Sequence, residues 1–496
     1  MSNNSRGLVR SMAIIGSSQS LNIVISIVRV KALAIMLGPL GVGLLGIYSN
    51  LLDMVKTAAG LGIGKSGVRQ IAVAKQDEQV LGRVRRVVLL AHIIQGSLAM
   101  GAVWLFRFQI SEWLFGNNTY VNEVGLIGIA ILLTLLGTAH TAILQGMRRI
   151  DDLGRVTIYS ALVGSIVGLA AIWFYGVIGL VWFVIAQPLA VVVIAFQYTS
   201  RLPQLKENIL NFSAFWQEWK PMAKLGTAFM LGGLATTITL LLVRRSITQE
   251  IGLEAAGLFA AAWSISMIYV GLMLGAVSAD YYPRLAEVIT DRKVATKLMN
   301  DQLQLLVSIG GPILLLLIGT APWIMTLLYS SEFRSGSELL QWMTAGNVFK
   351  LASWPLAFSI VAASRSKTFF LMELSFNIIF LIFIWLLLPS LGLKSTAIAL
   401  LIGYLVYFVI VIILATSLQG FYWESLSLVL VSMHIILALI LLGLTLIYPY
   451  VGAIISIFIF FLTGLFGLRV VLTKIGLKGQ MANYFHKFFN FIRWPI

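Results

Sequence analysis

Long apolar segments alternate with short polar segments along almost the whole chain. Each apolar run is rich in Leu, Ile, Ala and Gly, and a helix of about 20 such residues spans the hydrocarbon core of a bilayer. Helices also satisfy their own backbone hydrogen bonds in lipid, and runs of this length are too long for barrel strands. We therefore predict an all-α polytopic membrane protein. About fourteen transmembrane helices are expected near residues 12–37, 44–64, 87–106, 124–145, 156–175, 178–198, 226–247, 256–279, 303–320, 339–362, 369–388, 396–416, 425–447 and 451–472.

The composition agrees with this pattern and excludes several kinds of chemistry. Of 496 residues, 59% are hydrophobic and 11% are charged, which lies outside the range of soluble domains. The chain has no cysteine, so disulfides, thiolate metal sites and cysteine nucleophiles are excluded. Its four histidines are scattered without metal-ligand spacing, and no GxxxxGK[ST] loop occurs. We expect no catalytic residue, no metal and no cofactor. The N-terminal apolar run lacks a small-residue cleavage site, so we expect it to be a retained first span.

The net charge of +16 is distributed in a way that indicates membrane orientation. If the N-terminus is cytoplasmic, most basic residues fall on the cytoplasmic side, as the positive-inside rule requires. We expect both termini to be cytoplasmic and no nucleic acid to bind, although the loop 418–424 carries no basic residue. The opposite side holds only Arg107, Arg334 and Lys394. The basic residues of the predicted cytoplasmic side are Arg83, Arg85, Arg86, Arg148, Arg149, Arg155, Arg201, Lys206, Lys220, Lys224, Arg284, Arg292, Lys293, Lys297, Arg365, Lys367, Lys474, Lys478, Lys487 and Arg493.

A weak internal repeat relates the two halves of the chain. At an offset of 214 residues, Gly43 and Leu44 meet Gly257 and Leu258. Six spans separate the copies, so both face the same way, and such parallel repeats are related by an axis along the membrane normal. We expect a binding site between the halves, near the first and seventh spans. The predicted domains are a six-helix bundle at 1–200, a cytoplasmic linker at 201–225, a second six-helix bundle at 226–417, and the last two helices with a basic tail at 418–496.

Two of the predicted spans carry an arginine without an acidic residue within one helical turn. A cation at the bilayer centre costs about 2.5 to 3.5 kcal/mol on insertion scales, so it usually marks a pathway or an ion pair. In the first span, Asn22, Ser26 and Arg29 follow one another at helical spacing and form a polar stripe. In the seventh span, Arg244 continues a stripe of small and polar residues. We predict that Arg29 and Arg244 bind an anionic substrate.

Other charged positions leave two interpretations open. Lys31, Lys56, Arg245 and Lys350 add positive charge to the predicted substrate-binding set, although Lys31 is also placed where it can reach the interface by snorkelling. Asp53, Asp280 and Glu373 are candidates for binding a coupling ion. Asp53 with Lys56 and Asp280 with Arg284 could equally be local ion pairs, and Glu373 could snorkel. On balance the interior is cationic, which suits a phosphate-linked sugar because guanidinium groups bind phosphate oxygens in bidentate fashion.

Several segments resemble one family of transporters. They are LGPLGVGLLGIYSNLLDMVKTAAGLGIGKSGVRQIA (Leu37 to Ala72), LFGNNTYVNEV (Leu114 to Val124), LQGMRRIDDLGRV (Leu144 to Val156), YYPRLAEVITDR (Tyr281 to Arg292) and the run from Ala345 to Leu374. The similarity covers roughly residues 10 to 415. It is to the Wzx-type polysaccharide flippases of the multidrug/oligosaccharidyl-lipid/polysaccharide (MOP) transporter superfamily, in the branch for O-antigen and enterobacterial common antigen.

The resemblance implies a flippase of the bacterial inner membrane. Such a protein moves undecaprenyl-diphosphate-linked oligosaccharide from the cytoplasmic to the periplasmic leaflet by alternating access. It implies a central cavity lined by the first, second, seventh and eighth spans, where Arg29, Lys31, Asp53, Lys56, Arg244, Arg245 and Asp280 are the matching positions. The expected partners are this lipid-linked oligosaccharide, membrane lipids, and other glycan-assembly membrane proteins such as a polymerase or a chain-length regulator.

Two other functions compete with this one. A multidrug or cation exporter of the same superfamily usually has an acidic cavity and twelve spans, and neither feature is predicted here. A membrane-embedded enzyme of a glycan pathway generally needs a sizeable extramembrane loop, whereas the longest polar loop, residues 200–224, is short and amphipathic.

Overall fold

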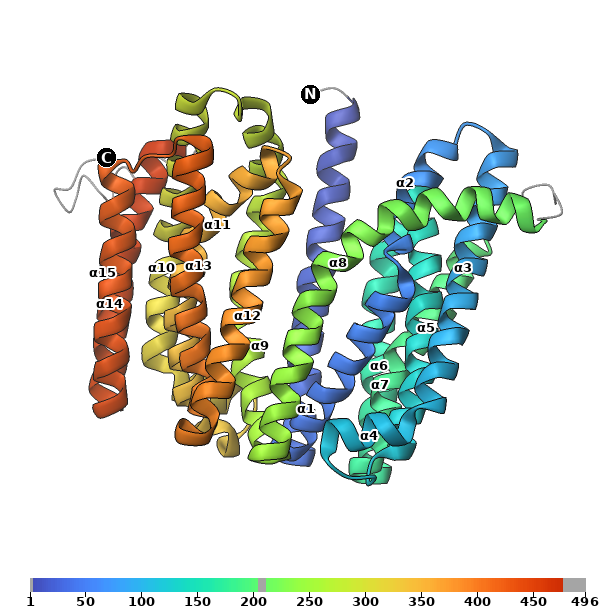
Figure 1. The fold of residues 1–496 in the computed structure, drawn as a ribbon, viewed down its shortest axis with the longest axis horizontal. Helices are drawn as coiled ribbons and strands as arrows, with labels where there is room; N and C mark the ends of the chain where they lie inside the picture. The colour runs from blue at the N-terminus through green and yellow to red at the C-terminus, as the bar shows by residue number, and fades with distance from the viewer. Residues whose placement is uncertain (1–2, 204–210, 476–496) are drawn as a thin grey trace. The chain divides into compact units, whose positions relative to one another are not determined.

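The computed structural model describes residues 3–203 and 211–475, and every regular element in these ranges is a helix (Figure 1). The chain divides into two compact units, Met1–Leu258 with Leu328–Glu332 and Phe259–Leu327 with Phe333–Ile496. The first unit holds α1 (Asn3–Gly60), α2 (Ile63–Ala74), α3 (Glu78–Leu105), α4 (Arg107–Phe115), α5 (Val121–Gly146), α6 (Ile150–Tyr175), the short η1 (Gly176–Ile178), α7 (Gly179–Thr199) and α8 (Phe212–Glu250). Most of the second unit consists of α9 (Leu253–Val288), α10 (Arg292–Leu328), η2 (Ser331–Gly336), α11 (Ser337–Ala362), α12 (Ser366–Leu391), α13 (Lys394–Gln419), α14 (Ser425–Ile447) and α15 (Pro449–Ile475).

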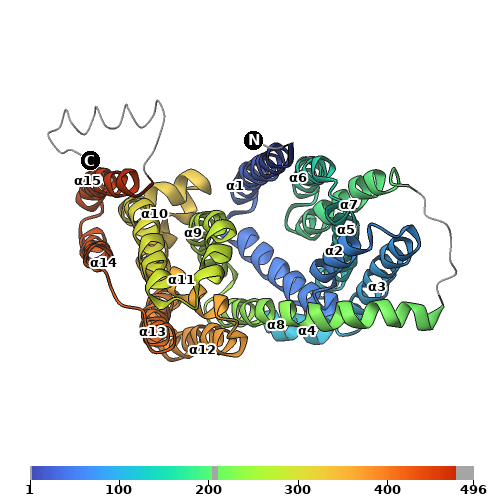
Figure 2. The ribbon, with the colours of Figure 1, turned by 90° about the horizontal axis from the view of Figure 1, so that it is seen from above.

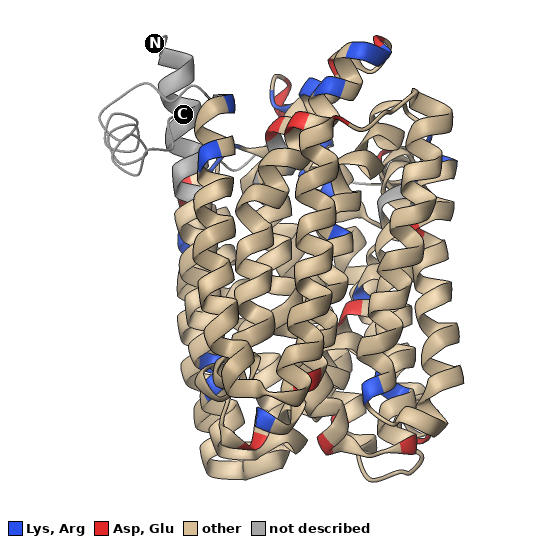
Figure 3. Cartoon of the chain, turned by 90° about the vertical axis from the view of Figure 1, so that its left-hand side faces the viewer, with Lys and Arg blue, Asp and Glu red and all other residues tan. Residues whose placement is uncertain are grey.

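The predicted fold class is confirmed. Eleven segments of the described ranges are long and apolar enough to cross a membrane. Two of them, Gly16–Gly60 and Ile150–Thr199, each contain two of the predicted spans. Figure 3 shows that few charged residues interrupt the middle of the helices. The predicted domain boundaries stay a prediction. The basic residues Lys206, Lys478, Lys487 and Arg493, on which the orientation also rests, lie outside the described residues.

The first two predicted spans are joined at a sharp break inside α1. Gly38 has φ 61° and ψ −161°, a conformation that glycine adopts more readily than other residues, and Pro39 follows it. Proline cannot donate the backbone hydrogen bond that would continue the first helix. A Cβ atom on Gly38 would also lie 2.6 Å from the Glu332 carboxylate. The chain therefore changes direction at this point and returns as the second half of α1.

A close helix crossing follows this break. A Cβ atom on Gly43 would lie 2.3 Å from the Leu253 carbonyl oxygen, and one on Gly257 would lie 1.9 Å from that of Pro39. The two backbones therefore approach each other in a way that only glycine allows. Gly43 and Gly257 are also the residues that the predicted repeat makes equivalent. The repeat itself stays a prediction.

Helix α8 has two parts with different surroundings. Its first part lies across α2 and α3, where Phe215, Trp219 and Met222 pack against an apolar cluster that includes Ile71 and Leu81. The second part runs alongside α1, and Figures 1 and 2 show both parts. Within α8, Gly226 meets the Leu61 carbonyl group, which a Cβ atom on Gly226 would approach to 2.1 Å. Part of the predicted linker 201–225 is thus the beginning of the seventh spanning helix.

In the second unit, α14 and α15 pack against α10. A Cβ atom on Gly311 would lie 2.2 Å from the ring of His434 in α14, and one on Gly467 of α15 would lie 2.2 Å from the Ser308 carbonyl oxygen. Leu441 and Leu442 of α14 join the buried cluster formed by α9, α10 and α11. The predicted final helix pair is therefore packed closely on this unit.

Candidate functional site

Two adjoining cavities follow the inner faces of α1 and α5 in the first unit. One has a volume of about 390 Å³ and is lined by residues of α1, α5 and α7. The other, of about 400 Å³, is lined by residues of α1, α2, α3, α5 and α8. Lys56, Thr138 and Thr141 line both, so the two cavities are direct neighbours. We call them together the α1–α5 groove.

Arg29 lines this groove, as its position on the polar stripe suggested. Its guanidinium donates a hydrogen bond to the Gln187 side-chain oxygen on α7 and lies 5.3 Å from the centre of the Phe183 ring. The buried Nε atom has no hydrogen-bond acceptor among the described residues. A buried donor without an acceptor costs about 1 to 3 kcal/mol, so a ligand oxygen or a water at this point is favoured.

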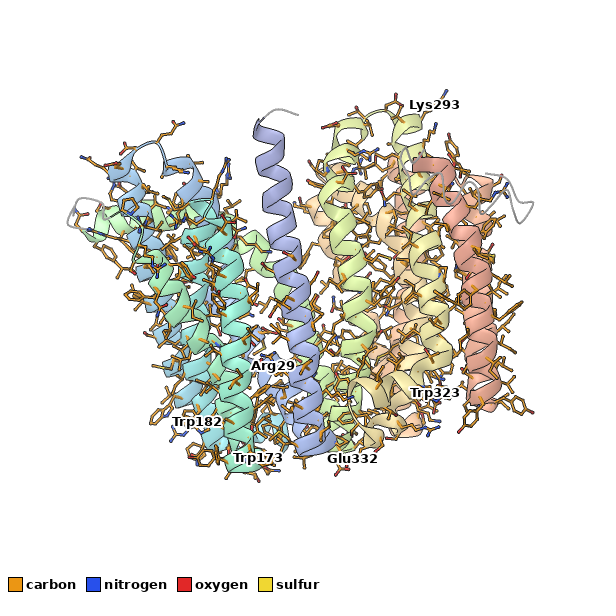
Figure 4. The ribbon with its side chains drawn as sticks, turned by 180° about the vertical axis from the view of Figure 1, so that it is seen from behind. Arg29, Trp173, Trp182, Lys293, Trp323 and Glu332 are labelled. Atoms are coloured by element: carbon orange, nitrogen blue, oxygen red, sulfur yellow. The ribbon has the colours of Figure 1, made fainter. Side chains whose placement is uncertain are left out.

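The long helix α1 carries Arg29, which is half-buried, far from both ends of the helix. Figure 4 shows it on α1 above Trp173, Trp182 and Glu332. Trp173 and Trp182 are exposed on the outside of the unit, and tryptophan is enriched at membrane interfaces. Asn22 and Ser26, of the same stripe, are half-buried. Lys31 is half-buried too, and it takes part in an interaction of its own.

Asp53 and Lys56 form a local ion pair within the groove. The Lys56 ammonium lies 2.6 Å from the Asp53 carboxylate, and both side chains are more than a third exposed. Both therefore face the groove rather than a dry interior, and both line the cavity that Arg29 lines. The Asp53 carboxylate also attracts the guanidinium of Arg244 on α8. The local ion pair that the sequence left open is present, and a role of Asp53 in binding a coupling ion stays a prediction.

Arg244 and Arg245 are placed differently from Arg29. Arg244 is only 8% exposed, its Nε atom has no acceptor among the described residues, and it is not among the residues that line the groove. The Nε atom of Arg245 donates to the Trp113 carbonyl oxygen at 2.7 Å, and its guanidinium lies 5.0 Å from the Trp113 ring. Arg245 therefore holds α4 against α8. Substrate binding by these two arginines stays a prediction.

A second polar cluster lies in the other unit and joins two of the predicted residues. Glu373 accepts a hydrogen bond from the Tyr407 hydroxyl and attracts Lys350 electrostatically. The Lys350 ammonium lies 5.1 Å from the centre of the Tyr404 ring. Asp280, the remaining candidate, is exposed and paired at 3.0 Å with Arg284. Asp280 therefore forms a local surface ion pair, and such pairs contribute little to the free energy of folding.

Sequence reasoning missed the polar face of α5. Thr134, Thr138, Thr141 and Gln145 all line the groove. Their spacings of four, three and four residues place them on one face of a helix. The signal was present in TLLGTAHTAILQ, but it carries no charge, and threonine is common in membrane helices because its hydroxyl can bond to its own backbone.

Comparison with known proteins agrees with this architecture. Residues 32–338 match the family described as polysaccharide biosynthesis protein. The chain belongs to that family. Two relatives, the lipid III flippases of Escherichia coli (strain K12) and Shigella flexneri, are each 25% identical over 390 residues, which is 76% of this chain and 91% of theirs.

Solved structures show the same fold. The lipid II flippase MurJ in an inward closed conformation has a TM-score of 0.67 at 16% identity. The match covers 95% of this chain and 100% of the MurJ chain. An inward-facing MATE family multidrug transporter of the MOP superfamily has a TM-score of 0.65 at 15% identity, with 81% and 94% covered. These neighbours share the fold that the sequence resemblance indicated, and this member of the polysaccharide biosynthesis family is a multi-pass membrane protein.

Proposed function

We propose that the chain is a flippase, a transporter and not an enzyme, for undecaprenyl-diphosphate-linked oligosaccharide of the O-antigen repeat-unit type. The proposed transport runs from the cytoplasmic to the periplasmic leaflet of the bacterial inner membrane by alternating access. Membership of the polysaccharide biosynthesis family and the names of the two flippase relatives support this proposal. Membrane lipids and other glycan-assembly proteins, such as a polymerase or chain-length regulator, are the proposed partners.

The observation that supports the proposal most is the set of cationic and polar side chains that line the α1–α5 groove. Arg29 and Lys56 bring positive charge to one cavity whose wall also holds hydroxyl and amide groups. Charge-assisted hydrogen bonds from guanidinium and ammonium groups are the usual means of holding phosphate oxygens. We propose that Arg29 and Lys56 receive the diphosphate while the polyprenyl tail remains in lipid, because moving that tail into a polar groove would forfeit its favourable apolar surroundings.

Genetic complementation tests this function. Deletion of the gene should cause undecaprenyl-linked oligosaccharide to accumulate on the cytoplasmic leaflet, and the wild-type gene should reverse the accumulation. Arg29→Ala should restore transport poorly, with a loss of about tenfold or more, because a hydrogen bond to a charged group is worth about 1.5 to 3 kcal/mol.

Arg107→Ala is the matched control. Arg107 is a half-buried arginine that stacks on Trp104 at 4.0 Å and lies outside the groove, so this variant should restore transport fully. Full restoration by Arg29→Ala would contradict the proposed role of Arg29. Drug sensitivity of the deletion strain with glycan export intact would instead favour the multidrug exporter.

A further inference from the structure

We infer that the polar face of α5, formed by Thr134, Thr138, Thr141 and Gln145, binds the saccharide part of the substrate, next to the cationic residues that take the diphosphate. This inference rests on the proposed function and divides the groove into two subsites of different chemistry. It assigns sugar recognition to α5, a helix that carries none of the charged candidates.

The hydrogen bonds of the three threonines determine what the α5 face can bind. Thr134 donates its hydroxyl hydrogen to the Ala130 carbonyl oxygen at 2.6 Å, Thr138 to that of Thr134 at 2.8 Å, and Thr141 to that of Gly137 at 2.9 Å. A hydroxyl has one hydrogen to donate and two lone pairs that accept. Since each hydrogen is used within the helix, each hydroxyl presents only an acceptor to the groove.

An acceptor surface discriminates between the two ends of the proposed substrate. An ionised diphosphate has acceptor oxygens and no donors, so it cannot form hydrogen bonds with these hydroxyls. Sugar hydroxyls and acetamido N–H groups are donors, and they can. The cations of the same groove have the opposite property, because Arg and Lys side chains only donate. Arg29 and Lys56 therefore match the diphosphate, and the threonine hydroxyls of α5 match the sugars, whereas the Gln145 amide both donates and accepts.

The dimensions of the α5 face also fit an extended ligand. Thr134 and Gln145 are eleven residues apart, which at 1.5 Å per residue corresponds to about 16 Å along the helix. Thr134 lines the cavity with Arg29, Gln145 lines the adjoining cavity, and Thr138 and Thr141 lie where the two cavities meet. The three threonines are half-buried, as are Arg29 and Lys56, and Gln145 is exposed. One molecule can thus contact the cations and the α5 face together.

A binding experiment with two probes tests the inference. The probes are undecaprenyl diphosphate and the undecaprenyl-linked oligosaccharide extracted from the deletion cells, each titrated into purified protein in detergent. The double variant Thr138→Val/Thr141→Val removes two acceptors while keeping the side-chain shape. It should bind the oligosaccharide probe roughly tenfold more weakly, and the sugar-free probe as well as the wild type does. Arg29→Gln should weaken the binding of both probes.

Two further variants separate recognition from a general effect on the fold. Thr157→Val on α6 removes a hydroxyl that makes the same kind of bond, to the Leu153 carbonyl oxygen at 2.9 Å, but lies outside the groove. It should bind both probes normally. Thr138→Ser/Thr141→Ser keeps the acceptors and should recover most of the affinity for the oligosaccharide probe that the valine variant loses.

The possible failures are distinguishable. If the wild type binds neither probe, the proposed function fails and the inference fails with it. If the wild type binds both probes equally, or the valine variant loses affinity for both or for neither, the saccharide subsite is overturned while the flippase function stands.

Discussion

Arg29 and Arg244 occupy membrane-spanning helices of the same unit, but their surroundings give them different properties. Arg29 lines a groove and has a neutral partner, the Gln187 side chain. Arg244 is buried, and the Asp53 carboxylate on α1, which also contacts Lys56 at 2.6 Å, attracts its guanidinium. A buried cation whose counter-charge is removed is strongly destabilising. In the conformation described, Arg244 is therefore a residue on which the packing of α8 against α1 depends.

A double-mutant cycle tests this pairing. Asp53→Asn should lower the stability of the folded protein by about 1 to 2 kcal/mol, less than for a fully buried pair because water screens the half-exposed Asp53 carboxylate. Combining it with Arg244→Gln should recover part of the loss, because the uncompensated charge is then absent. The measurement is the thermal unfolding of purified protein in detergent.

The control is Glu112→Gln, at an exposed site on α4, which should change stability by less than about 0.5 kcal/mol. Strictly additive effects would rule out the pairing.

The sequence was informative about Arg29 and less so about Arg244, for a physical reason. Helical periodicity showed that Arg29 continues a polar stripe, and a polar stripe on an otherwise apolar helix indicates a wet or protein-facing side. The environment of Arg244 depends on Asp53 and Tyr329, which are far away in the sequence. The Arg245 contact with Trp113 spans 132 residues. Periodicity within one helix contains no information on such partners.

At the scale of whole helices, glycine contacts decide how closely α1 and α9 approach. The first turns of α9 cross the second half of α1 at Gly43 and Gly257, where a Cβ atom would collide with backbone oxygens. Backbone atoms cannot move aside as a flexible side chain can, so a methyl group at either position forces the helices apart. Overpacking of this kind typically costs about 1 to 3 kcal/mol.

Gly257→Ala should therefore lower the melting temperature of the purified protein and reduce transport in the complementation assay. Gly101→Ala on α3 is the matched control. No atom lies within 4 Å of a Cβ built at Gly101, and alanine is the better helix former by about 0.5 to 1 kcal/mol. Gly101→Ala should leave stability unchanged or raise it. An equal response of the two variants would show that the α1–α9 crossing does not depend on close backbone approach.

Helix identity was predictable from the apolar runs, because each run of spanning length must satisfy its backbone hydrogen bonds internally. The junctions were harder to predict. The boundary expected at residue 225 falls within α8, which continues from Phe212 to Glu250. Phe215 and Trp219 give the start of this helix an apolar side that packs on α2 and α3. An amphipathic helix end has the composition of a polar loop, so hydropathy alone does not distinguish the two.

For the molecule as a whole, the distribution of basic residues predicts which side of the membrane each loop occupies. The natural absence of cysteine allows a direct test, because any introduced thiol is the only one present. Gln76 lies in the α2–α3 loop, near the arginines of the predicted cytoplasmic side, and Asn118 lies in the α4–α5 loop on the opposite side; both are exposed. A membrane-impermeant maleimide should label Asn118→Cys in intact spheroplasts but Gln76→Cys only after permeabilisation. The cysteine-free parent should remain unlabelled under both conditions. The reverse labelling pattern would place both termini in the periplasm and would contradict the orientation predicted from the basic residues. It would also contradict the proposed direction of transport, which assumes that orientation.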